Sequence, residues 1–175
     1  MTLRAGAILR AGSSGWWAAK ARRVRVFLVG RVTDAEIRAV EGLMTPVQLA
    51  LFRSMHRSDQ RHSLDVVAWL RSGGAGEPDL LLAGLLHDAG KGNTGLLPRI
   101  VYSLTQAYGG WVAAPFRLIP GLGEAIARLE RHPDSSARLA STVGCNARTV
   151  ELIRHHIEPR DNDLGRLLRL ADEAN

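Results

Sequence analysis

Residues 80–92, LLLAGLLHDAGKG, form an apolar run that ends on His87 and Asp88, with Lys91 three residues further on. Pro78 precedes the run, and leucines cover nearly every side of the helix that it predicts, which indicates a buried, central helix. An ionised carboxylate in such surroundings is costly unless it has a partner. The stretch therefore predicts both the middle of the fold and a polar site where the buried helix ends.

The chain after residue 33 is predicted to be helical almost throughout. Thr33–Glu36 and Thr45–Gln48 are capping-box patterns, and a proline follows the second threonine, so helices are expected over about 34–43 and 46–55. Ser58 or Asp59 can cap a third helix through residues 60–71. Further helices are expected over 124–131, 133–143, 147–158 and 164–173. A strand signal is confined to residues 24–29, so the predicted fold class is all-α, with one compact helical domain over residues 33–175.

Length and composition restrict the class of protein. A chain of 175 residues, 46% hydrophobic and 23% charged, fits one globular domain with a proper core. Cys145 is the only cysteine, which excludes an internal disulfide and favours a reducing compartment. There is no apolar run of about 20 residues and no secretory signal pattern, so we expect a cytoplasmic protein.

The net charge of +6 belongs to residues 1–32, interpreted as a basic N-terminal arm. Seven basic residues and no acid precede Asp34, whereas 16 basic and 17 acidic residues follow from there on. Basic residues beside Trp16 and Trp17 are typical of contact with an anionic membrane surface or with nucleic-acid phosphates, and a mobile or mispredicted leader is the alternative. A nucleic-acid partner is disfavoured because no recognised binding module surrounds these residues.

Residues 96–123 form an apolar insert that contains no acid and only two arginines. Several glycines and prolines interrupt it, so short helices are expected, capping the polar site. A hairpin that contacts a membrane is the alternative interpretation.

The order of the histidines and acids along the chain is informative. His62 lies 25 residues before His87-Asp88, and Asp172 follows near the end. A divalent cation would reconcile their burial, because a carboxylate balances its charge while imidazoles supply lone pairs. This arrangement on successive helices resembles the HD-domain superfamily of metal-dependent phosphohydrolases, over residues 45–175. The resemblance implies that His62, His87, Asp88 and Asp172 are metal ligands.

Further motifs extend the resemblance. HDAGK is the most recognisable local pattern of that superfamily and includes Lys91, and RHPDSSARLA resembles the His-Pro helix start of two-metal members, which implicates His132. IRHHIEP resembles their late histidine motif and offers His155 and His156, of which His156 ranks first. Two transition-metal ions, such as iron or manganese, are expected. His56 matches no motif and is interpreted as a surface histidine.

The resemblance implies a function, hydrolysis of a phosphomonoester or phosphodiester in a nucleotide or another small phosphorylated compound. Asp88 and Lys91 are the expected catalytic residues, and Arg61, beside His62, is a candidate phosphate contact because guanidinium pairs bidentately with phosphate. The sequence HHIEPRDND lacks the Gly-Tyr-Pro signature of the cyclic-dinucleotide branch. A small branch that cleaves dinucleoside polyphosphates is the nearest comparison. The alternative is a metal-stabilised signalling or membrane-adaptor domain with little turnover.

Overall fold

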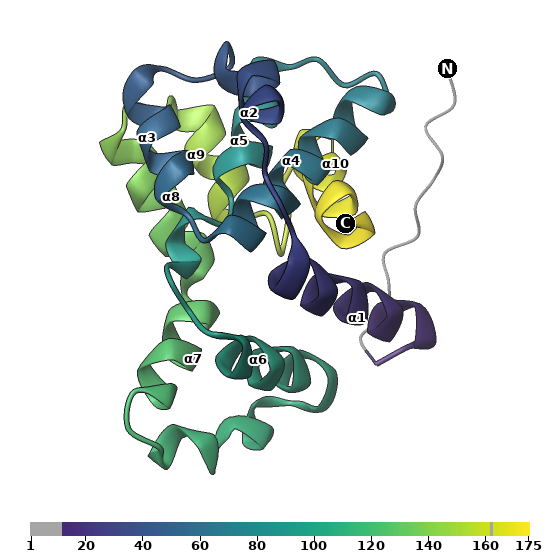
Figure 1. Cartoon of the computed structure of the whole chain (residues 1–175), viewed down its shortest axis with the longest axis vertical. Coiled ribbons are helices and arrows are strands. Elements are labelled where there is room, and N and C mark those ends of the chain that lie inside the picture. The colour runs from purple at the N-terminus through teal and green to yellow at the C-terminus, as the bar shows by residue number, and fades with distance from the viewer. Residues whose placement is uncertain (1–11, 162) are drawn as a thin grey trace.

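The structure, a computed structural model, describes residues 12–161 and 163–175 and is built from α-helices and three short 3-10 helices (Figure 1). The α-helices are α1 (Ser14–Val29), α2 (Asp34–Glu41), α3 (Pro46–Ser54), α4 (Arg57–Ser72), α5 (Pro78–Leu86), α6 (Leu96–Tyr108), α7 (Leu122–Glu130), α8 (His132–Thr142), α9 (Ala147–Arg154) and α10 (Leu164–Ala174). The 3-10 helices are η1 (Ala89–Lys91), η2 (Gly110–Ala113) and η3 (Phe116–Leu118). No strand occurs in these described ranges, and the all-α prediction is confirmed.

Helix α5 lies in the middle of the larger of two helical bodies. It contacts α3, α4, α9 and α10, and Leu80, Leu85 and Leu86 are fully buried. Gly84 lets α4 approach closely, because a Cβ atom there would lie 3.3 Å from Val66 and from Val67. The apolar run quoted above is thus the core of the fold, as predicted, and its end is held in place by the surrounding helices.

Local signals set several helix starts. Thr33 and Glu36 form the predicted capping box of α2, and Thr45 and Gln48 form that of α3. The predicted cap of α4 was wrong: His56 caps the helix, because its Nδ1 accepts a hydrogen bond from the Ser58 backbone.

His56 is therefore half-buried rather than a free surface histidine. Its ring stacks on Phe27 at a centroid distance of 4.7 Å, and its Nδ1 also lies 2.7 Å from Ser58 Oγ. Asp59, the other predicted cap, is buried and accepts two hydrogen bonds of 2.7 Å from Arg99 instead.

Helices α6 and α7, with η2 and η3 between them, form a smaller body below the first (Figure 1). It has its own small core around Val101 and Ile126. Helix α6 has 13 residues and is longer than the short helices expected for the insert. Several of the body's apolar side chains are exposed, among them Leu97, Tyr108, Trp111, Leu118 and Ile119. Contact with a membrane stays a prediction, and no helix of the described residues is long and apolar enough to span one.

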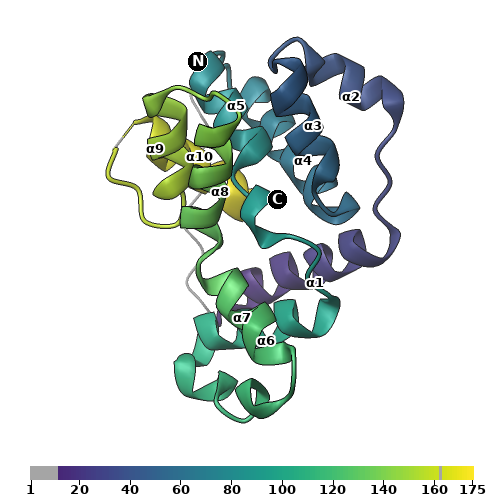
Figure 2. The ribbon, with the colours of Figure 1, turned by 90° about the vertical axis from the view of Figure 1, so that its left-hand side faces the viewer.

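Residues 14–29 form helix α1, so the strand signal over residues 24–29 was wrong. The helix crosses between the two bodies and contacts α4 and α6 (Figures 1 and 2). Trp16, Lys20, Arg23 and Phe27 lie at helical spacing and share one face, which turns toward the rest of the molecule. The described part of the predicted arm is therefore a packed helix, whereas Arg4 and Arg10 lie outside the described residues. Contact of the arm with an anionic surface stays a prediction.

Candidate metal centre

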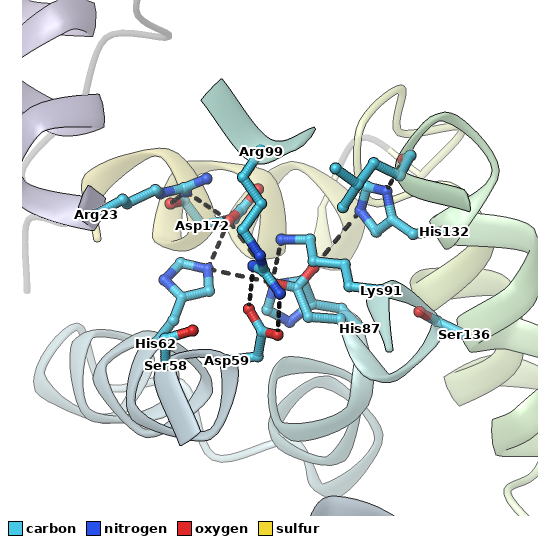
Figure 3. A network of polar contacts seen from close by, with 12 residues as sticks. Arg23, Ser58, Asp59, His62, His87, Lys91, Arg99, His132, Ser136 and Asp172 are labelled. Atoms are coloured by element: carbon cyan, nitrogen blue, oxygen red, sulfur yellow. Dashed lines mark hydrogen bonds and ion pairs between the residues drawn. The ribbon is translucent and has the colours of Figure 1, made fainter. Parts of the chain in front are cut away.

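Six side chains from separate parts of the sequence meet between α4, α5, α8, α9 and α10. Figure 3 labels four of them, His62, His87, His132 and Asp172. The six are His62 on α4, His87 and Asp88 at the end of α5, His132 at the start of α8, His156 just after α9, and Asp172 on α10. All are buried except Asp172, whose side chain is 18% exposed. Each of these residues was predicted from the sequence as a ligand, and the fold brings all six together.

Three of the four imidazoles are oriented by the ends of helices. The Nδ1 atom of His87 lies 3.0 Å from the Gly84 carbonyl oxygen in the last turn of α5. Two other histidines make the same contact. His132 Nδ1 lies 2.6 Å from the Leu129 carbonyl oxygen, and His156 Nδ1 lies 2.7 Å from the Ile153 carbonyl oxygen. Carbonyls in the last turn of a helix have no partner within the helix and can only accept, so Nδ1 carries the proton. Each Nε2 is left with a lone pair, which is the form that binds a metal.

The first donor group contains His62, His87 and Asp88, whose ligand atoms all lie within 4.8 Å of one another. The Oδ2 atom of Asp88 lies 3.5 Å from His87 Nε2 and 3.9 Å from His62 Nε2. Asp172 adds a second carboxylate, with Oδ1 at 2.8 Å from His62 Nε2 and 3.7 Å from His87 Nε2. Two imidazoles and two carboxylates therefore face one point.

The second donor group contains Asp88, His132 and His156, again within 4.8 Å. The other oxygen of the shared carboxylate, Asp88 Oδ1, lies 3.5 Å from His132 Nε2. One oxygen thus faces each group. This is the arrangement that a carboxylate bridging two neighbouring cations requires, and each group can hold a metal ion.

Two buried atoms in the cluster support a cation. His87 Nε2 and Asp88 Oδ1 are inaccessible to solvent and form no hydrogen bond within the described residues. Buried polar atoms in folded proteins nearly always have a partner. Both are electron-pair donors aimed into the cluster, so a metal ion would satisfy them, and the mixture of imidazole nitrogen and carboxylate oxygen suits first-row transition metals.

Electrostatics keep Asp88, His132 and His156 in their metal-binding forms. Burial opposes ionisation of Asp88, but His87 and Lys91 outweigh it and hold the pKa of that carboxyl well below its usual value. Burial, followed by the charge of Lys91, lowers the pKa of His132 to about 3. Burial and the neighbouring His87 lower the pKa of His156 to about 4. At neutral pH the carboxylate is therefore ionised and these two imidazoles are neutral.

His87 and Asp172 titrate differently from the other donors. Burial lowers the pKa of His87, but Asp88 and Asp172 outweigh burial and raise it above the ordinary value. Burial likewise opposes ionisation of Asp172, whereas Arg23 holds its pKa well below the usual range. Two ionised carboxylates thus stabilise positive charge between them, which is the property that a cation site needs.

The cluster lies at the floor of a pocket of about 750 Å³. His62, Asp88, His132, His156 and Asp172 all line the pocket, together with Lys91. Lys91 Nζ lies 2.5 Å from Asp88 Oδ2, so an ammonium stands beside the shared carboxylate. A volume of this size accommodates a small organic ligand.

Two residues predicted for the site lie elsewhere. Helix α9 ends at Arg154 rather than near residue 158, and His155 turns away from the cluster, with Nε2 at 3.3 Å from Glu151 Oε2. Arg61 forms ion pairs with Glu36 and Asp65 and does not line the pocket. The structure therefore brings neither His155 to the six clustered side chains nor Arg61 to the pocket.

Other residues at the site were missed by the sequence analysis. Arg23 donates to Asp172 Oδ1 at 2.8 Å, across 149 positions of sequence, and Lys20 lines the same pocket. Both had been assigned to the basic arm. Their helical spacing with Trp16 and Phe27 was the available signal, and the charge imbalance of the segment obscured it.

No family model, curated protein or solved structure matches the chain. The arrangement of the donors therefore indicates what chemistry the site can support. Imidazoles and carboxylates in a pocket open to a small molecule can bind divalent ions while leaving room for a ligand beside them.

Neighbouring histidines provide a matched test of this geometry. Replacing His156 with alanine should weaken Mn²⁺ binding at least tenfold, because one Nε2 donor is lost, whereas the same replacement of His155 should leave the affinity unchanged. Calorimetric titration of each purified variant with Mn²⁺ measures both. Equal effects of the two replacements would contradict the position given to His156.

Proposed function

We propose that this protein is a metal-dependent phosphohydrolase acting on a nucleotide or another small phosphorylated compound. The observation that carries the proposal is Asp88, whose two carboxylate oxygens face two separate histidine groups. Sites with two adjacent ions of this kind serve phosphoryl-ester hydrolysis in many enzymes. The order of the donors along the chain, similar to that of the HD-domain superfamily, supports the same assignment.

The chain's own residues have definite tasks in such a reaction. Two transition-metal ions, of which iron and manganese fit the donors, would supply Lewis acidity toward phosphoryl oxygens and activate water. Asp88 Oδ2 accepts the hydrogen bond of Lys91 and so fixes the direction of the ammonium group. Lys91 can then donate to a nonbridging phosphoryl oxygen, where negative charge is stabilised in the transition state.

The direct test measures metal content and phosphate release together. The full chain, loaded with Mn²⁺ or Fe²⁺, should release phosphate or nucleotide from at least one member of a panel that includes p-nitrophenyl phosphate, bis-p-nitrophenyl phosphate, 5′-nucleotides and diadenosine polyphosphates. We expect the Lys91→Met variant to keep its metal while kcat falls about 100-fold or more, since it removes one donor to the developing charge.

A carboxylate on the surface of α8 provides the control. Asp134 has a side chain that is 70% exposed, so Asp134→Asn should leave both metal content and turnover unchanged. A Lys91→Met variant with wild-type kcat would remove that lysine from the mechanism. A metal-loaded chain without turnover on the whole panel would contradict the proposed hydrolase activity.

A metal-stabilised adaptor domain is the second candidate function. It is favoured by the exposed Trp111 and Leu118 of the smaller body, whose side chains are 75% and 86% accessible. The same experiment separates the two candidates, because an adaptor would bind its metal ions and release no phosphate from any substrate.

A further inference from the structure

Helix α1 forms one wall of the pocket that lies above the metal ligands. Trp16, Trp17, Lys20, Arg23 and Phe27 all line the pocket from this helix. In Figure 3, Arg23 reaches from α1 to Asp172, on the side of the cluster away from His132. A segment that precedes the ligand-bearing helices in sequence thus supplies a large part of the surface that a bound molecule would touch.

Two tryptophans make part of this wall aromatic. Trp16 is buried and packs edge-on against Trp17, at a centroid distance of 4.7 Å. Trp17 is half-buried and lies 6.2 Å from Tyr108 of α6 in a tilted arrangement. Trp17 is therefore held in place on two sides while it still lines the pocket, and this is the property that a stacking platform for a planar ring needs.

Lys20 lies next to the aromatic wall. Its Nζ donates a hydrogen bond of 3.1 Å to Gln106 Oε1 and lies 4.9 Å from the centroid of the Trp16 ring. Burial, followed by the charge of Arg23, lowers the pKa of Lys20 to about 7. Asp172 and Asp88 act in the opposite direction but do not outweigh burial, and the direct contacts of the ammonium given above include no carboxylate. An anionic ligand in the pocket would therefore stabilise its charge further.

The cations of the pocket differ in their partners. Arg99 is held by two hydrogen bonds to Asp59, and Arg169 pairs with Glu173, so both are neutralised by a carboxylate in the wall. Arg23 and Lys91 instead pair with Asp172 and Asp88, two of the proposed metal ligands. A cation shared with a metal ligand remains able to donate to a phosphate group bound beside that ligand.

We propose that α1 selects the substrate of this site, with Trp17 stacking on a nucleobase while Lys20 and Arg23 bind the phosphate end of the same nucleotide. This inference rests on the proposed phosphohydrolase function and narrows its substrate class to nucleotides. The aromatic wall favours a planar base over an alkyl chain because stacking is specific to flat rings. Gln106, beside Lys20, adds an amide that can hydrogen-bond to a base or ribose.

Equilibrium binding tests the proposal without turnover. The chelator-treated full chain is titrated by calorimetry at pH 7 with 5′-AMP, with ribose 5-phosphate, which lacks the base, and with octyl phosphate, which has an alkyl chain in its place. We expect 5′-AMP to bind about tenfold more tightly than either of the others. Trp17→Ala should reduce the affinity for 5′-AMP to that for ribose 5-phosphate, and Trp17→Phe should largely restore it.

Charge on the same helix is tested by a matched pair. Lys20→Met should lower the affinity for all three ligands about tenfold. Arg25 is an exposed residue of α1 that does not line the pocket, so Arg25→Gln should leave all three affinities unchanged. Equal binding of 5′-AMP and ribose 5-phosphate, tighter binding of octyl phosphate, or no binding of any ligand would each overturn the role of α1. Turnover and metal content, measured separately on the panel above, decide the proposed function itself.

Discussion

The Asp88→Asn variant is expected to lose both metal ions, whereas removal of one histidine should cost only one of them. Asparagine keeps the shape of the side chain but replaces one anionic oxygen with an amide nitrogen that only donates. Because Oδ2 faces His62 and His87 while Oδ1 faces His132, one of the two groups always meets the amide nitrogen. The other group meets a neutral oxygen in place of a charged one.

Metal analysis after gel filtration measures the outcome. We expect two Mn²⁺ per wild-type chain and less than one in Asp88→Asn. The affinity for Mn²⁺ should fall at least about 100-fold, because loss of a residue that only supports a ligand already lowers metal affinity by up to about that factor. The His62→Ala and His132→Ala variants should each retain one ion. An Asp88→Asn chain that keeps one ion at wild-type affinity would mean that the carboxylate serves a single group.

The chelator-treated variant gives an independent measurement of the same carboxylate. The pKa of Asp88 is held well below its unfolded value of about 4, so its ionised form stabilises the folded chain above that pH, and this contribution is lost as the pH falls. Asparagine lacks it at every pH. The melting temperatures of wild type and variant should therefore differ most near neutral pH and converge on acidification.

Local sequence patterns anticipated the fold well where the relevant interactions span a few residues. The capping boxes at Thr33 and Thr45 and the buried run of α5 depend on contacts within one turn or one helix, and all three were predicted correctly. The strand signal over residues 24–29 failed for the complementary reason. Valines favour strands on average, but this segment packs as a helix against α4 and α6, and such tertiary contacts override the average preference.

The side chains of the candidate metal centre were predictable because they form an ordered pattern along the sequence, whereas their neighbours were not. Nothing local to Arg23 indicates a bond to Asp172, which lies 149 positions away. His155 and His156 show how fine the distinction is, since a helix end at Arg154 rather than at residue 158 decides which imidazole turns inward. Helix ends are the least certain feature of any pattern, so a choice that depends on one of them requires the fold.

Gly90→Ala is expected to destabilise the protein strongly and to disturb the second donor group, although it adds only one methyl group. Gly90 lies in η1, between Asp88 and Lys91, and is pressed against the first turn of α8. A Cβ atom there would lie 2.5 Å from the Ser136 backbone nitrogen and 2.6 Å from the His132 carbonyl oxygen. These are backbone atoms of a helix and cannot turn aside as a flexible side chain would, so η1 and α8 must separate.

The free energy of unfolding should fall by about 3 kcal/mol, which is the upper end of the range for an overpacked core position. In a chain of this size that corresponds to a melting temperature lower by about 10 °C. Thermal unfolding followed by circular dichroism measures the shift, and Mn²⁺ titration should show weaker binding because Asp88 and His132 move apart with η1 and α8. Ser136→Ala isolates the hydrogen bond of 2.8 Å that Ser136 Oγ accepts from the Gly90 backbone, and should cost only about 1 kcal/mol. Gly76→Ala, in an exposed loop with nothing within 4 Å of the added atom, should change the melting temperature little. If the Gly90→Ala and Gly76→Ala variants have the same melting temperature, the close approach of η1 to α8 does not hold Asp88 opposite His132.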